Sequence, residues 1–137
     1  MLLLDANIIL ELLLDQDRAD ECAKLLTAIK DGDKEVIVTD LILDSILIVM
    51  ESRGKSPSEL ATFLSSIAAL KGLKLYWLSL TDRLQATEHM TKNRLDFEDA
   101  TAYEVCHRLS LDGIVTFDKH FEGLPNLQRF EPQNLLQ

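Results

Sequence analysis

Short, uninterrupted apolar runs alternate with longer stretches of helical periodicity, and this alternation constrains the fold more than any other feature of the sequence. Helical stretches fill the intervals between the runs, which suits parallel strands because each crossover connection needs a dozen or more residues. The sequence therefore predicts an α/β fold, a three-layer α/β/α sandwich around a mainly parallel sheet of four to five strands. The expected strands are Met1–Leu4, Glu35–Thr39, Leu73–Leu78 and Ile114–Thr116.

Helix signals are clearest where a polar cap precedes an apolar stripe. Ser56-Pro57-Ser58-Glu59 combines a Ser cap, Pro at the first helical position and an acid in the first turn. The tail from Phe121 contains Pro125 and Pro132 and is expected to be mostly irregular. A chain of 137 residues with few Gly and Pro is predicted to form one domain, residues 1–137. The expected helices are 6–14, 18–30, 41–53, 57–70, 81–92 and 96–109.

The chain is acidic, with 14 Lys and Arg against 23 Asp and Glu and a formal net charge of -9. This excess argues against binding nucleic acid through a simple basic surface. Residues 52–95 alone are basic, and their cations either form a rim for RNA or are scattered over separate helices. These cations are Arg53, Lys55, Lys71, Lys74, Arg83, Lys92 and Arg94.

Other classes of protein are disfavoured by what the sequence contains. Cys22 and Cys106 fit buried thiols in a reducing compartment better than a disulfide scaffold. The apolar start has no basic leader and is broken by Asp5, so neither a signal peptide nor a membrane span is expected, and a cytoplasmic location is predicted. No Gly-rich phosphate loop is present. His120 lies close to Asp118, yet an exposed histidine is its simpler interpretation.

Three acids fall where the ends of the predicted strands should meet. Asp5 follows the first strand, Asp118 lies just beyond the fourth, and Asp99 is in the first turn of the helix over 96–109. Parallel strands place their carboxyl ends at one edge, where ligands of open α/β sheets bind. Each acid alone could be a helix cap, a dipole partner or a turn residue. Together they would repel each other, and Mg²⁺ or Mn²⁺ would relieve the repulsion.

Four stretches of the sequence carry a resemblance to a known family. They are Leu4-Asp5-Ala6-Asn7, Val38-Thr39 before an apolar helix, Phe97-Glu98-Asp99-Ala100, and Ile114-Val115-Thr116-Phe117-Asp118 followed by Phe121. The most specific of them is the last, a strand that ends in Thr-x-Asp. On these motifs, nearly the whole chain resembles the PIN-domain family, the fold of VapC-like toxins and related ribonucleases.

This resemblance implies an endoribonuclease that uses one or two Mg²⁺ or Mn²⁺ ions to hydrolyse RNA. Asp5, Asp99 and Asp118 match three of the acids that bind metal in the family, and Asn7 and Thr116 match polar residues that support the site. The resemblance also implies an RNA substrate, possible pairing with an antitoxin protein, and a homodimer. The expected role is the toxin of a type II toxin–antitoxin pair, with no membrane association.

One position departs from the family pattern. Ser45 stands where the family usually has a Glu, and its neighbour Asp44 points about 100° away on a helix. Asp44 is the fourth candidate for the catalytic and metal-binding set, Asp40 is a weaker one, and a solvated Asp44 is the alternative. A second hypothesis follows, in which the chain is a catalytically weakened PIN module for binding or dimerisation. A receiver-like aspartate domain fits the order of elements poorly.

Overall fold

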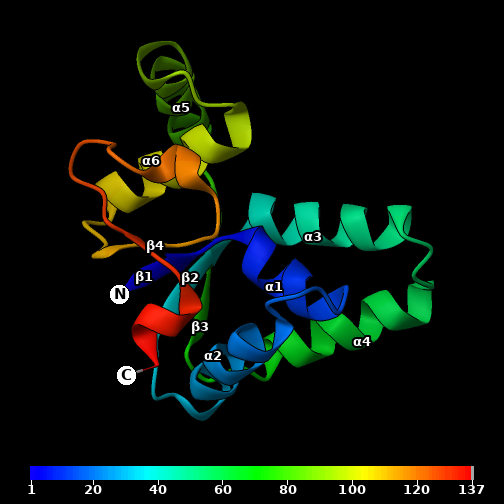
Figure 1. Cartoon of the computed structure of the whole chain (residues 1–137). Helices are drawn as coiled ribbons and strands as arrows, with labels where there is room; N and C mark the ends of the chain where they lie inside the picture. Colours follow the sequence, from blue (N-terminus) through cyan, green and yellow to red (C-terminus); the bar gives the residue numbers. More distant parts are fainter. Residues whose placement is uncertain (137) are drawn as a thin grey trace.

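A five-stranded parallel sheet runs through the centre of the computed structural model, which describes residues 1–136 (Figure 1). The strand order is β3-β2-β1-β4-β5, and every neighbouring pair is parallel. The mainly parallel sheet predicted from the alternation is confirmed. The strands are β1 (Leu2–Leu4), β2 (Val36–Thr39), β3 (Leu73–Tyr76), β4 (Gly113–Val115) and β5 (Arg129–Phe130).

The helices begin and end within two residues of their predicted limits. Local caps explain much of this agreement, because Ser56 and Glu59 form a reciprocal capping box at the start of α4. A similar box of Ser79 and Asp82 opens α5. The helices are α1 (Ala6–Leu13), α2 (Ala19–Asp31), α3 (Asp40–Ser52), α4 (Pro57–Ala68), α5 (Leu80–Asn93) and α6 (Phe97–Arg108), with short 3₁₀ turns η1 (Lys119–Phe121) and η2 (Pro132–Leu135).

The helices form one layer on each side of the sheet (Figure 1). On one side α1 packs against α2 and α3, and α3 packs against α4. On the other side α5 packs against α6, which also contacts β1. The predicted three-layer sandwich is therefore confirmed. Within the described residues, no helix combines the length and the apolar character needed to cross a bilayer.

The central strands are buried on both faces, as expected of parallel strands covered by two helical layers. Leu3, Leu4 and Ile114 are fully buried, and all four residues of β2 are buried as well. The polar side chains of Thr39 and Thr116 are also fully buried, each at the carboxyl end of a strand. The core therefore continues up to the edge of the sheet at which the candidate acids were expected.

The tail contains more regular structure than the sequence suggested. Most of its described residues are irregular, as predicted, but β5 and η2 were not predicted from the sequence. Gly113 permits the close approach of β5 to β4, because a Cβ at this position would lie 2.3 Å from the Gln128 carbonyl oxygen. Two backbone hydrogen bonds then join β4 to β5, from Ile114 to Gln128 and from Thr116 to Phe130, each 2.9 Å long.

Candidate functional site

Asp5 lies at the carboxyl end of β1 and forms the N-cap of α1. Its Oδ1 atom accepts a hydrogen bond of 2.8 Å from the Ala6 N–H, which satisfies a free donor of the first helical turn. Its Oδ2 atom accepts a hydrogen bond of 2.7 Å from the Thr116 hydroxyl. The side chain is buried. The capping role and the site role considered for Asp5 are therefore compatible, because each uses a different oxygen.

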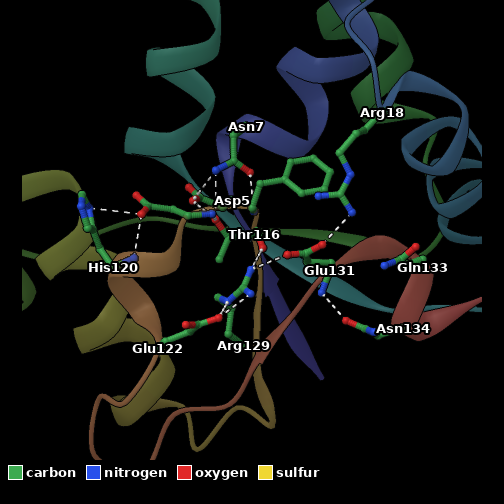
Figure 2. A network of polar contacts seen from close by, with 12 residues as sticks. Asp5, Asn7, Arg18, Thr116, His120, Glu122, Arg129, Glu131, Gln133 and Asn134 are labelled. Atoms are coloured by element: carbon green, nitrogen blue, oxygen red, sulfur yellow. Dashed lines mark hydrogen bonds and ion pairs between the residues drawn. The ribbon is translucent and has the colours of Figure 1, made fainter.

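Asn7 and Thr116 link the first helix to the end of β4 (Figure 2). The Asn7 amide nitrogen donates to Thr116 Oγ1 at 3.0 Å and more weakly to Asp5 Oδ2 at 3.4 Å. The Asn7 amide oxygen accepts from the Phe117 N–H at 3.2 Å. Thr116 Oγ1 also accepts from the Asp118 N–H at 3.0 Å. Segments 111 residues apart in the sequence are thus held together around one carboxylate.

Asp99, Asp118 and His120 form a second part of the site. The Asp99 side chain is 14% exposed and that of Asp118 is 29% exposed. His120 Nδ1 lies 3.1 Å from Asp118 Oδ1 and 3.9 Å from Asp99 Oδ2. One nitrogen or oxygen atom from each of the three side chains lies within 4.8 Å of the others, so the group is compact enough to hold a metal ion.

The environment of Asp5 disfavours its charged form. Burial raises its pKa to about 6, against hydrogen bonds from Thr116 and Ala6 that lower it. The negative charges of Glu98 and Asp118 raise it further. Asp5 is therefore close enough to these acids for their charges to interact.

Asp99 is perturbed in the same direction. Burial raises its pKa to about 7, and the charges of Asp96, Asp118 and Asp5 add to this effect, while His120 lowers it. Among residues 1–136, no Lys or Arg forms an ion pair with Asp5, Asp99 or Asp118. The carboxyl edge of the sheet thus gathers mutually repelling carboxylates without a compensating strong base.

Comparisons with known proteins identify the family to which this fold belongs. The family model described as PIN domain matches residues 2–127. This chain is a member of the PIN-domain family. A search of curated proteins found no match.

Solved structures share the PIN fold at low sequence identity. The crystal structure of Mycobacterium tuberculosis VapC20, described as a sarcin–ricin loop cleaving toxin, has a TM-score of 0.71 and 16% identity, over 86% of this chain and 90% of that one. A toxin–antitoxin complex from Klebsiella pneumoniae has a TM-score of 0.68 and 16% identity, over 96% of this chain and 98% of that one.

Ser45, at which the family resemblance predicts a Glu, lies on α3. Ser45 is half-buried there, and Asp44 is exposed and forms no hydrogen bond or ion pair with any other residue within 1–136. Asp40 is engaged elsewhere, because its carboxylate accepts the Leu78 N–H at 2.9 Å and pairs with Arg83 at 3.5 Å. Asp40 therefore ties α3 to the segment before α5, and the role of Asp44 stays a prediction.

Two features of this PIN domain were not predicted from the sequence. Glu98 acts on Asp5 through its charge, although only Asp99 was singled out in that turn. Its place in the first turn of α6, beside Asp99, was the signal that could have found it. The second feature is His120, whose closeness to Asp118 in sequence was noted but whose distance to Asp99 depends on the fold.

A charged network braces the backbone next to the site (Figure 2). Arg129 donates to the Thr116 carbonyl at 3.0 Å and to Glu131 at 2.9 Å. The other Glu131 oxygen accepts from Arg18 at 2.6 Å. The Arg18 guanidinium lies 4.0 Å from the centre of the Phe117 ring, a cation–π contact. The tail thereby holds residues 116–117 against the start of α2.

The basic residues of 52–95 do not all gather at the acids. Arg83 pairs with Asp40 and Lys55 pairs with Glu59, away from the site. Arg94 lines a cavity of about 310 Å³ that borders the acidic cluster. A larger cavity of about 470 Å³ lies between α1 and α4, has mainly apolar walls and contains none of the candidate acids. The residues around the smaller cavity are Asn93, Arg94, Leu95, Asp96, Asp99 and His120.

Proposed function

We propose that this chain is a divalent-metal-dependent endoribonuclease that hydrolyses RNA phosphodiester bonds at Asp5, Asp99 and Asp118, and that it is the toxin of a type II toxin–antitoxin pair. The observation that carries the proposal is the gathering of three mutually repelling carboxylates at one edge of a PIN-domain sheet. The toxin role is supported by the descriptions of two structural neighbours, a sarcin–ricin loop cleaving toxin and a toxin–antitoxin complex.

The side chains at this edge fit a hard divalent cation. Carboxylate oxygens are preferred ligands of Mg²⁺ and Mn²⁺, and a cation would remove the repulsion that raises the pKa of Asp5 and Asp99. A bound Mg²⁺ or Mn²⁺ ion supplies an activated water and stabilises negative charge on the leaving oxygen. Thr116 and Asn7 fix the orientation of Asp5 through the hydrogen bonds described above. Such supporting bonds restrict a ligand to one geometry.

RNA cleavage tests the catalytic set. Asp99→Asn and Asp118→Asn keep the size of the side chain but remove its charge, so we expect Mn²⁺-dependent cleavage of single-stranded RNA to fall by about a hundredfold or more. Asp20→Asn is the matched control, because Asp20 is exposed on α2, and it should cleave as the wild type does. Equal cleavage by the Asp99 variant and the wild type would contradict the proposed site.

Metal binding is measured separately by calorimetric titration with Mg²⁺ and Mn²⁺. Asp5→Asn should weaken binding about tenfold or more while still capping α1, since Asn is also a good N-cap. A wild-type protein that binds neither ion would rule out the metal-dependent mechanism. Asp44→Asn belongs in the same series, because an unchanged affinity would remove Asp44 from the set of ligands.

Ser45 and the exposed Asp44 favour a second candidate, a catalytically weakened PIN module that serves in binding or dimerisation. Ser45→Glu distinguishes the two. If the wild type is a module of this kind, it should show no metal-dependent cleavage, and the Ser45→Glu variant should gain it. If the wild type cleaves RNA, the scaffold hypothesis is wrong.

The partners we propose are RNA, an antitoxin and a second copy of this chain, all in the cytoplasm. An antitoxin would be expected to cover the carboxylates with an Arg or Lys. Trp77, Leu80 and Leu84 offer a surface for the second copy, because these large apolar side chains are 71%, 84% and 65% exposed around the start of α5.

A further inference from the structure

Asp118 and Asp99 have a nitrogen ligand within reach on the same side of the site. His120 lies in the 3₁₀ turn that follows β4 (Figure 2). Its Nδ1 atom lies 3.1 Å from Asp118 Oδ1 and 3.9 Å from Asp99 Oδ2. The family resemblance would place a Glu at the position of Ser45, and its neighbour Asp44 is exposed and forms no hydrogen bond or ion pair with another residue within 1–136. His120 is therefore a candidate for a further ligand on the β4 side of the site.

The separations fit a single coordination sphere. In an octahedral site with ligand distances of about 2.1 Å, adjacent ligand atoms lie about 3.0 Å apart and opposite ones about 4.2 Å apart. The distance from His120 Nδ1 to Asp118 Oδ1 is 3.1 Å, and to Asp99 Oδ2 it is 3.9 Å. Both values lie within the range that one ion would impose, so a small adjustment of the Asp99 or His120 rotamer would complete the geometry.

The backbone holds His120 in this place. The carboxylate of Asp118 accepts the His120 N–H at 2.8 Å and so caps the turn. The next residue, Phe121, is fully buried and anchors the turn in the core. The His120 side chain itself is 78% exposed, so its ring is accessible to an ion that enters from solvent. A fixed backbone and an accessible ring are what a ligand residue requires.

We propose that His120 supplies a nitrogen ligand to a divalent cation held by Asp99 and Asp118, and that this ligand makes the site prefer Mn²⁺ to Mg²⁺. The inference rests on the proposed metal-dependent function. Mg²⁺ takes oxygen ligands almost exclusively, whereas imidazole nitrogen is a common ligand of first-row transition metals. His120 thus adds affinity for Mn²⁺ that a purely carboxylate site would lack.

The competing interpretation is that His120 only forms an ion pair or a hydrogen bond with the two acids. In that case its ring would point away from the ion, or donate to a carboxylate oxygen, and no bond from nitrogen to the metal would exist. Pulsed EPR of the Mn²⁺-loaded protein distinguishes a metal-bound His120 from one that contacts only the acids. A nitrogen bound directly to Mn²⁺ modulates the echo signal, and a distant one does not.

The experiment compares the wild type, His120→Gln and His107→Gln. His107 is exposed at the other end of α6, about 12 Å along the helix from Asp99, and serves as the matched control. We expect nitrogen modulation in the wild type and in His107→Gln, and none in His120→Gln. Calorimetry should show about tenfold weaker Mn²⁺ binding by His120→Gln, with Mg²⁺ binding changed by less than about threefold.

The outcomes distinguish this inference from the proposed function. Mn²⁺ binding by the wild type without nitrogen modulation, or modulation that persists in His120→Gln, would overturn the role of His120 and leave the carboxylate site intact. Equal losses of Mg²⁺ and Mn²⁺ affinity in His120→Gln would overturn the metal preference. A wild type that binds no Mn²⁺ at all would overturn both proposals.

Discussion

At the scale of single residues, Asp99 has a different protonation state in the folded and the unfolded chain near neutral pH. Its folded pKa of about 7 lies well above the ordinary Asp value of 3.8, because the side chain is buried among other acids. Between these two values the folded state binds more protons than the unfolded state. The contribution of Asp99 to stability is therefore greatest below pH 4 and is lost as the pH rises through 7.

This predicts that Asp99→Asn stabilises the metal-free protein at alkaline pH. We expect the variant to exceed the wild type by about 1–4 kcal/mol in the free energy of unfolding at pH 8 with a chelator, since it removes an ionised buried acid. Near pH 4 the difference should be small. Urea denaturation at both pH values measures it, and Asp20→Asn should show no such pH dependence. A variant less stable than the wild type at pH 8 would refute the account.

Asp5, Asp99 and Asp118 could be singled out from the sequence because each sits at a fixed offset from a predicted strand or helix start. The sequence does not show which oxygen of Asp5 caps α1 and which accepts a hydrogen bond from Thr116. Those roles depend on the Asp5 rotamer and on the approach of a segment 111 residues away. The distance between His120 and Asp99 could not be predicted from the sequence for the same reason.

At the scale of elements, β5 and the network of Arg129 and Glu131 secure the end of β4. Arg129 is 12% exposed and Glu131 is 18% exposed, so both charges are largely removed from water. Glu131 is held between Arg129 and Arg18, whose hydrogen bond lowers the pKa of Glu131. Charges in such surroundings depend strongly on their partners, and removal of one partner leaves the others poorly solvated.

We expect Arg129→Gln to lower the free energy of unfolding by about 2–4 kcal/mol, because Glu131 and the Thr116 carbonyl both lose a donor. Urea denaturation with intrinsic fluorescence measures the loss. Arg53→Gln is the control, since Arg53 is exposed and should change stability by less than about 0.5 kcal/mol. Similar stabilities of the two variants would show that the network contributes little.

The helices were predictable to within two residues because caps and apolar periodicity are local signals. The strand β5 could not be predicted, because a strand of two residues has no measurable periodicity and its pairing with β4 depends on Gly113. The contact between Arg18 and Glu131 spans 113 residues and has no local signature either. The secondary-structure elements and the acids were therefore predictable from the sequence, whereas the contacts that brace them were not.

At the scale of the whole molecule, an apolar surface remains around the start of α5. Trp77, Leu80 and Leu84 lie within eight residues, and their exposure is typical of an interface. The edge strand β3 directly precedes this segment, so the apolar surface begins next to one edge of the sheet.

Sedimentation tests the proposed homodimer. The wild type should sediment as a dimer at micromolar concentration, and Leu80→Lys should sediment as a monomer because a charge is placed in the apolar surface. Leu136→Lys, in the exposed tail, is the control and should remain dimeric. A wild type that sediments as a monomer, or a Leu80→Lys variant that stays dimeric, would remove this surface from consideration.

The position of β1 between β2 and β4 also determines when the site can form during synthesis. Asp5 is translated 111 residues before Thr116, whose hydroxyl orients its carboxylate. The carboxylates can therefore meet only after the segment that follows α6 has been synthesised. A chain that stops between α6 and β4 contains Asp5 and Asp99 but lacks Asp118. Under the proposed function, such a truncated chain is expected not to cleave RNA.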